Sequence, residues 1–139
     1  MEIKTVFATV IGIVGGIANG FFGSLTAAFY SLVIIMAADF VIGIGVALTN
    51  NSPKTKSGGL SSSVCFKGIV KKIIMLLLVG VTYRIQIVVD IPMLRDIVIM
   101  AFIANELMSI LENAALMGIV LPEQLKRVID ILNDKGGEK

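Results

Sequence analysis

Two long apolar runs lie next to each other near the start of this chain of 139 residues. The first, residues 6–22, has no charge in 17 residues, and the second, residues 26–48, has one charge in 23. A helix that crosses a bilayer needs about 20 apolar residues, with a range of about 17 to 25. A single helix over both runs would be about 64 Å long, far more than a hydrocarbon core of about 30 Å. The chain is therefore expected to turn near Gly23 and Ser24.

The composition of the whole chain also favours a membrane protein. Hydrophobic residues make up 56% of the chain and charged residues 16%, whereas soluble domains have about 45 to 50% apolar and about 25% charged residues. The chain has no His and one Cys, Cys65, which excludes intrachain disulfides, zinc sites built from Cys and His, and Ser/His or Cys/His catalytic pairs. We therefore expect no enzyme activity, no catalytic residue, no cofactor, no metal site and no nucleic-acid partner.

Two further hydrophobic stretches are long enough to cross a membrane. Residues 69–89 are apolar as far as Val81 and then contain Arg84, whose long stem lets its charge reach the interface. Residues 97–120 are also of membrane length but are interrupted by polar side chains. These are Asn105, Glu106, Glu112 and Asn113. The sequence predicts an all-α, polytopic membrane helical bundle with three to four transmembrane helices, formed by residues 1–139 as one domain.

A basic loop orients the predicted helices. Residues 49–68 are expected to form a polar loop, because they are rich in Asn, Ser, Gly and Lys. The loop and the start of the next helix contain lysines and no acid. These lysines are Lys54, Lys56, Lys67, Lys71 and Lys72. By the positive-inside rule this segment is cytoplasmic, with Lys67, Lys71 and Lys72 as a basic anchor.

Counting crossings from this loop gives a multi-pass protein whose N- and C-termini are both cytoplasmic. If residues 6–22 instead lie at the membrane surface or re-enter it, three spans remain and the N-terminus is external. A cleaved signal peptide is a further alternative for this end of the chain.

Small residues recur every four positions in the first run, at Gly12, Gly16 and Gly20. Such a ridge lets two helix backbones approach closely, and this kind of packing drives helix association in lipid. The ridge is expected to pack either between subunits or within one subunit. A shorter version, Gly43 and Ala47, occurs in the second run.

Asp39 lies near the middle of the second run, where a carboxylate costs about 2.5 to 3.5 kcal/mol on insertion scales. It is therefore not expected to face lipid. Two interpretations are open at this stage. Asp39 is either a pore-lining or proton-sensitive group, or it forms a structural hydrogen bond to a neighbouring helix.

The fourth stretch carries polar residues spaced three and four positions apart, as expected for one side of a helix. They are Asn105, Glu106, Ser109, Glu112 and Asn113. Helices that lie at the membrane surface usually carry Lys and Arg on their polar face, and this stripe has none. We therefore expect the stripe to face a polar interior, as buried or pore-lining residues.

The end of the chain is expected to form a cytoplasmic amphipathic helix over residues 122–134. Proline suits the first turn of a helix, and Pro122 stands there. Gly136 and Gly137 are expected to end it. Its apolar face would contain Leu121, Leu125, Val128, Ile129 and Leu132. Such a helix could cap the bundle, bind the membrane surface or mediate assembly.

Several segments, taken in order, resemble the toxin-secretion/phage-lysis holin family. They are the run from Asp39 to Ala47, the segment from Lys67 to Lys72, the stretch from Asn105 to Asn113, and Met117, Gly118, Pro122 and Leu125. The resemblance covers roughly residues 38–134. Family members usually have about three spans, so residues 6–22 depart from the pattern.

The resemblance implies a phage holin of the bacterial inner (cytoplasmic) membrane. Such a protein forms a homo-oligomer in the lipid bilayer and opens lesions at a set time. The lesions release a cytoplasmic endolysin, or in some hosts a toxin. From the residues alone, a small oligomeric ion or proton channel remains an alternative, because a glycine-ridged helix followed by one central carboxylate also suits a proton carrier. A membrane adaptor protein is a third possibility.

Overall fold

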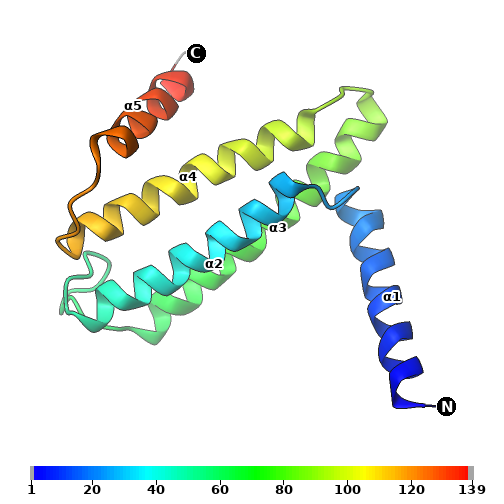
Figure 1. The fold of residues 1–139 in the computed structure, drawn as a ribbon, viewed down its shortest axis with the longest axis horizontal. Coiled ribbons are helices and arrows are strands. Elements are labelled where there is room, and N and C mark those ends of the chain that lie inside the picture. The colour runs from blue at the N-terminus through cyan, green and yellow to red at the C-terminus, as the bar shows by residue number, and fades with distance from the viewer. Residues whose placement is uncertain (1, 138–139) are drawn as a thin grey trace.

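The computed structural model describes residues 2–137, with side chains except those of residue 129 and residues 132–137. It contains five helices and no strand in this part of the chain (Figure 1). The helices are α1 (Ile3–Phe22), α2 (Ala27–Leu48), α3 (Ser62–Val89), α4 (Leu94–Leu116) and α5 (Glu123–Gly137). The expected all-α fold is confirmed, and the turn between the first two apolar runs lies at residues 23–26.

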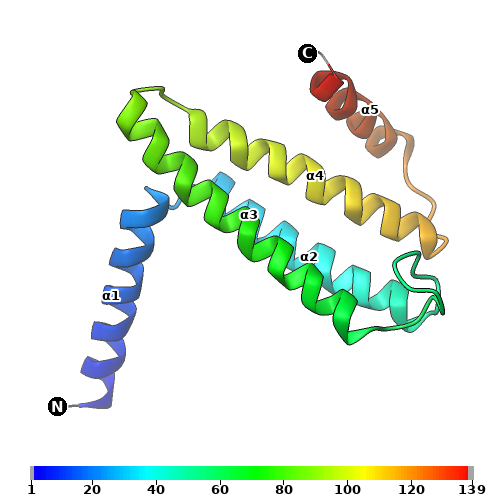
Figure 2. The ribbon, with the colours of Figure 1, turned by 180° about the vertical axis from the view of Figure 1, so that it is seen from behind.

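Helices α2, α3 and α4 form a bundle, in which α2 and α4 have the most extensive contact (Figures 1 and 2). Apolar residues three and four positions apart place one face of α2 in the core, as expected for helical periodicity. The buried core residues are Phe29, Leu32 and Met36 of α2, Met75 and Val79 of α3, and Ile99 of α4. The inward-facing side chains of each of these three helices therefore contact those of the other two in the core.

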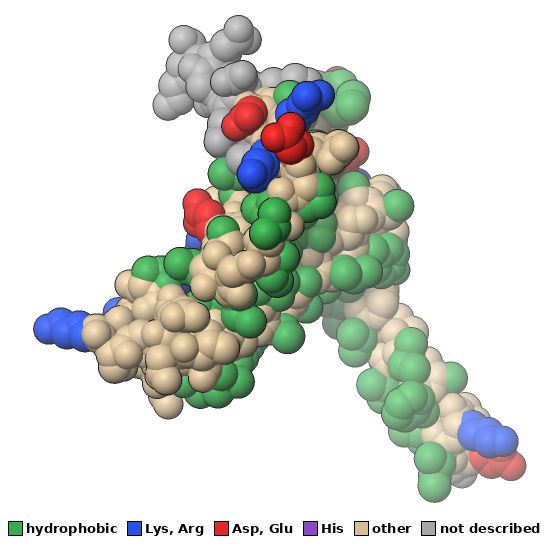
Figure 3. Space-filling model, turned by 60° about the vertical axis from the view of Figure 1, so that its left-hand side comes forward, with side chains coloured by type: hydrophobic (Ala, Val, Ile, Leu, Met, Phe, Trp, Pro, Cys, Tyr) green, Lys and Arg blue, Asp and Glu red, His purple; other side chains and the backbone are tan. Residues whose placement is uncertain are grey.

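Helix α1 leaves the bundle and points away from it (Figures 1 and 2). None of its residues is buried, and side chains such as Phe7 and Ile17 are about two-thirds exposed, at 68% and 69%. In Figure 3 hydrophobic side chains spread over α1 and over much of the bundle, whereas charged side chains gather near the ends. Helices with so much apolar surface are suited to lipid rather than water.

By length and hydropathy, α1 and α2 are each able to cross a membrane. That α3 and α4 also cross stays a prediction, as does the total of three to four spans. The 49–68 loop is shorter than expected, because α3 already begins at Ser62. We therefore call the connection between α2 and α3 the 49–61 loop.

The ends of α4 and α5 also differ from expectation. Helix α4 stops at Leu116 instead of residue 120, because Gly118 has φ +76°, the left-handed conformation that terminates helices. Helix α5 continues through Gly136 and Gly137, since glycine in a helix costs only about 1 kcal/mol relative to Ala. Of the apolar face predicted for α5, Leu125 and Val128 are exposed, while the side chains of Ile129 and Leu132 lie outside the described part.

Candidate functional site

An ionic cluster lies inside the bundle, with side chains from α2, α3 and α4. The ammonium of Lys72 donates a hydrogen bond to Asp39 Oδ2 at 2.8 Å and another to Glu106 Oε2. The side-chain amide of Asn113 donates to the other carboxylate oxygen, Asp39 Oδ1, at 3.4 Å. One lysine from α3 therefore links a carboxylate of α2 to a carboxylate of α4.

The cluster is shielded from the surroundings. The exposed fractions are 1% for Glu106, 8% for Asp39 and 6% for Asn113, and 16% for the side chain of Lys72. Among the described residues no buried side-chain nitrogen or oxygen lacks a hydrogen-bond partner. With both carboxylates ionised, the formal charge of the cluster is −1. Removing one partner from a buried ion pair costs about 3 to 5 kcal/mol, so the cluster joins the three helices.

The sequence places these residues by continuing the apolar rows of the core. Asp39 follows Met36 by three positions, and Lys72 precedes Met75 by three. On α4, Ile99, Glu106 and Asn113 are seven positions apart, and two helical turns return to the same face. Each helix thus changes from apolar to polar along one face, toward the end of the bundle that carries the 49–61 loop. We call this the loop end.

The predicted polar stripe of α4 is divided between two faces. Glu106 and Asn113 point into the bundle, and Ser109 is half-buried. Asn105 and Glu112 are exposed, because each precedes an inward residue by one position and is therefore turned by about 100°. Within one subunit the stripe is therefore not buried as a unit, and a pore-lining role for these two residues stays a prediction.

The basic anchor also divides. Lys67 and Lys71 are exposed on α3, as an anchor at the membrane surface would be. Lys72 is not part of such an anchor, since its ammonium is paired with Asp39 and Glu106. A count of charges along the sequence does not tell on which side of α3 each lysine lies. The spacing from Lys72 to Met75 and Val79, however, indicates that Lys72 lies on the inward face.

The glycines predicted to pack helices lie in different surroundings. A Cβ added at Gly12, Gly16 or Gly20 would meet nothing within 4 Å, so in the described part of the subunit this ridge packs on no other helix. In the second run, Gly43 lies opposite the amide of Asn113, with 3.8 Å between its ideal Cβ and Nδ2, and Ala47 is buried. The shorter motif therefore lies beside the ionic cluster.

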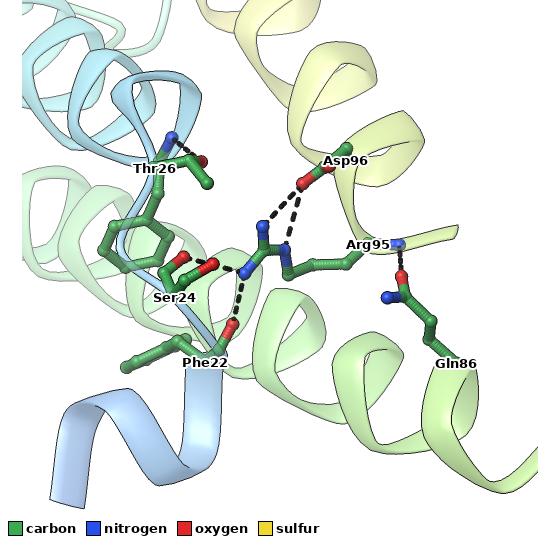
Figure 4. Close-up of polar contacts among 7 residues, drawn as sticks. Phe22, Ser24, Thr26, Gln86, Arg95 and Asp96 are labelled. Atoms are coloured by element: carbon green, nitrogen blue, oxygen red, sulfur yellow. Dashed lines mark hydrogen bonds and ion pairs between the residues drawn. The ribbon is translucent and has the colours of Figure 1, made fainter. Parts of the chain in front are cut away.

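Arg95, which sequence reasoning missed, fixes the opposite end of the bundle. This buried arginine donates hydrogen bonds to the backbone oxygens of Phe22 and Ser24, each at 2.9 Å, and to Asp96 Oδ1 at 3.0 and 2.8 Å (Figure 4). Its backbone N–H donates to Gln86 Oε1 at 2.9 Å. Arg95 thus holds the α1–α2 turn against α3 and α4. The sequence offered no motif for this contact beyond the glycine at the turn.

A cavity of about 100 Å³ lies beside the ionic cluster, between α2, α3, α4 and the 49–61 loop. We call it the loop cavity. Asp39 and Glu106 reach it from the cluster, and Lys54, Ser61 and Lys71 line it from the loop and α3. No group of three or more potential metal ligands occurs among the described residues.

Comparison with known proteins identifies the family of this chain. The model of the bacteriophage holin family matches residues 16–134, which include the last part of α1, the whole bundle and most of α5. The chain belongs to the bacteriophage holin family. It is therefore a holin-like membrane protein, and the resemblance noted in the sequence is confirmed.

The holin-family chain is similar over most of its length to proteins of several bacteria. It is 38% identical to an uncharacterized protein of Listeria monocytogenes over 125 residues, which are 89% of this chain and 84% of the relative. An uncharacterized 14.9 kDa protein of Clostridium perfringens is 30% identical over 87% of this chain and 88% of its own length. An uncharacterized protein of Bacillus subtilis is 29% identical, covering 85% and 84% of the two chains. No solved structure matches the chain.

Proposed function

We propose that this protein is a holin that assembles with copies of itself in the bacterial cytoplasmic membrane and opens lesions at a set time. The lesions release an endolysin, or a toxin, from the cytoplasm. The observation that carries the proposal, beside family membership, is the distribution of polarity in the bundle. Paired charges lie inside, and large apolar side chains cover much of the outside.

This distribution suits a subunit that accumulates without harm before lysis. A carboxylate that faces lipid raises the free energy of membrane insertion. Pairing the charges in the interior of the bundle avoids most of this increase. The apolar exterior can then stay in lipid as single bundles or small groups. In this state nothing requires a water-filled path through the membrane.

Two features favour lateral assembly. The glycine ridge of α1 is open to a partner, and small residues promote close helix packing in membranes. Asn105 and Glu112 are exposed on α4, and polar groups in a span are favoured where a partner helix or water satisfies them. An assembly of many copies would provide both environments.

The proposed topology follows the basic residues. Helices α1 to α4 cross the membrane, the 49–61 loop and α5 are cytoplasmic, and the N-terminus is cytoplasmic as well. Because α1 leaves the bundle, it would cross beside a neighbouring subunit. In the alternative with three spans, α1 lies along the outer surface and the N-terminus is external. Labelling an N-terminal tag from each side of the membrane distinguishes these arrangements.

Co-expression with an endolysin that has no secretion signal tests the lytic function. Culture turbidity is followed after induction of the pair and of each protein alone. We expect an abrupt fall in turbidity after a fixed delay, in the pair only. Continued growth of the pair, with the endolysin retained inside cells, would contradict the proposal.

A small ion or proton channel is a second candidate, and the unbalanced charge of the ionic cluster favours it. A carboxylate in excess of the cations can carry a proton or attract a cation inside a bundle. The two candidates differ in the size of what passes. A channel would collapse the ion gradient of vesicles while retaining an enclosed folded enzyme, whereas a holin would release both.

A further inference from the structure

Lys71 lies between two hollows of different character at the loop end. On one side it lines the loop cavity, together with Lys54 and Ser61. On the other side it lines an open groove along α3, whose wall is almost entirely apolar. The groove is formed by Phe66, Lys67, Val70, Lys71, Ile74 and Met75.

The two lysines of the groove form a cationic pair on one helix face. Lys67 and Lys71 are four positions apart, and residues at this spacing are neighbours on a helix surface. Both are exposed, and none of the ion pairs found among the described side chains uses either of them. Within that part of the chain, no acid neutralises either lysine.

The position of the groove along α3 matches the boundary between lipid headgroups and acyl chains. The helix has 28 residues and is about 42 Å long, so it exceeds a hydrocarbon core of about 30 Å by about eight residues. If the excess lies at the cytoplasmic end, Lys67 stands at the boundary and Lys71 just inside it. Val70 and Ile74 then face the acyl chains.

We propose that Lys67, Lys71 and the α3 groove form a binding site for one anionic phospholipid of the cytoplasmic leaflet. The phosphate lies between the two ammonium groups, and an acyl chain follows Val70 and Ile74 along the groove. Lys54 and Ser61 of the loop cavity provide a further cation and a hydroxyl for the headgroup. Basic pockets at the cytoplasmic ends of membrane helices bind anionic headgroups in this way.

The site rests on the proposed topology, in which α3 crosses the membrane, and not on lesion formation. It adds a specific ligand to what would otherwise be a general attraction of lysines to an anionic surface. The apolar groove is the feature that requires a lipid instead of free phosphate, because inorganic phosphate has no part that would fill it.

Native mass spectrometry tests the site. The full chain is reconstituted in vesicles of equal parts phosphatidylglycerol and phosphatidylcholine, extracted with mild detergent, and examined for lipid that stays bound. We expect one phosphatidylglycerol per chain and little phosphatidylcholine. The double variant Lys67→Gln/Lys71→Gln should retain at least about tenfold less phosphatidylglycerol, because each lysine near an anionic surface contributes to the attraction.

A matched control separates a site from general charge. Lys56→Gln/Lys126→Gln removes the same charge from two exposed lysines that line neither hollow, and it should retain the lipid as the unaltered chain does. Equal losses in the two double variants, or equal retention of both lipids by the unaltered chain, would overturn the proposal. Displacement of the lipid by inorganic phosphate alone would overturn it in favour of a phosphate site.

A third variant tests the groove without altering charge. Val70→Phe fills the apolar hollow beside Lys67 and Lys71, so it should also lower phosphatidylglycerol retention several-fold. Retention at the unaltered level would contradict the placement of the acyl chain.

Two further controls apply to all variants. Helix content by circular dichroism identifies any variant that has not folded. The variant Lys67→Arg/Lys71→Arg, which keeps both cations, should retain the lipid. Lipid retention by a chain that fails to lyse cells would separate this site from the proposed function.

Discussion

Arg95 Nη1 lies 2.9 Å from the backbone oxygen of Phe22, so the first turn of α4 is hydrogen-bonded to the last residue of α1. The same nitrogen also binds the oxygen of Ser24, and the guanidinium lies over the ring of Tyr83 with 5.7 Å between its carbon and the ring centroid. Helix α1 also contacts α3, where Phe21 lies against Gly80, although none of its residues is buried. Arg95 and this contact together set the direction in which α1 leaves the bundle.

Replacing Arg95 with Gln should loosen α1. The variant loses charge-assisted hydrogen bonds to two backbone oxygens, and bonds of this kind contribute about 1.5 to 3 kcal/mol each. Spin labels at Ile11→Cys and Ile97→Cys, in a Cys65→Ser background, report the distance between α1 and α4 by pulsed EPR. We expect a broader distance distribution in Arg95→Gln. Arg84→Gln, at an exposed position, is the control, and equal distributions in the two variants would contradict the role of Arg95.

Gly23 should not tolerate a side chain. Its φ is +77°, and an added Cβ would lie 2.6 Å from Tyr83 Cε2 and 2.8 Å from Arg95 Nη1. A backbone conformation of this kind costs a residue other than glycine about 1 to 3 kcal/mol. We expect Gly23→Ala to lower the melting temperature in detergent micelles, as followed by circular dichroism. Gly45→Ala, where nothing lies within 4 Å, should melt like the unaltered chain or higher. A similar fall in both variants would show a general effect of replacing glycine and contradict the role of the turn.

Lys72→Met should destabilise the bundle by leaving two carboxylates without their shared cation. The expected loss is about 3 to 5 kcal/mol, the cost of breaking a buried ion pair from one side. Adding Asp39→Asn and Glu106→Gln to Lys72→Met should recover most of this loss, because the cluster then contains no charge. Thermal unfolding of the single and triple variants measures both effects, with Lys56→Met, at an exposed position, as the control. A triple variant no more stable than Lys72→Met would show that the cluster does not act through charge pairing.

Asn105 and Asn113, on different faces of α4, should affect different properties. Asn113 is buried and bonded to Asp39, so Asn113→Leu should lower the stability of the single subunit. Asn105 is exposed and stands midway along α4 (Leu94–Leu116). Asn105→Leu should leave the stability of the subunit unchanged and reduce lateral assembly, since an interhelical polar contact in a membrane contributes about 0.6 to 2 kcal/mol. Chemical cross-linking in membranes measures assembly, and oligomers of unchanged size in Asn105→Leu would remove Asn105 from the interface.

The order of the helices could be predicted because it follows from length. Two apolar runs too long for one helix require a turn, and the turn lies at Gly23 as expected. The inward face of Asp39 could also be anticipated, from the cost of a carboxylate in lipid. The partner of Asp39 could not, because Lys72 stands 33 positions away and only the packing of α3 against α2 and α4 brings it close.

For a related reason, the sequence does not predict on which face of its helix each polar residue lies. Asn105 and Glu106 are adjacent in the chain, and a rotation of about 100° separates an exposed residue from a buried one. Spacing alone assigned both to one stripe. Arg95 was missed since its main partners are backbone oxygens, and backbone acceptors leave no trace in a residue pattern.

The unequal number of charges in the ionic cluster has an electrical consequence. Lys72 faces two carboxylates. With both of them ionised, the cluster carries one net negative charge, and this charge moves only if the helices move. Moving one elementary charge across the whole membrane changes its electrical energy by about 2.3 kcal/mol per 100 mV of membrane potential, and a partial movement changes it by less. In an array of joined subunits these small contributions add, and a group of bundles would respond to loss of the potential far more steeply than one bundle alone.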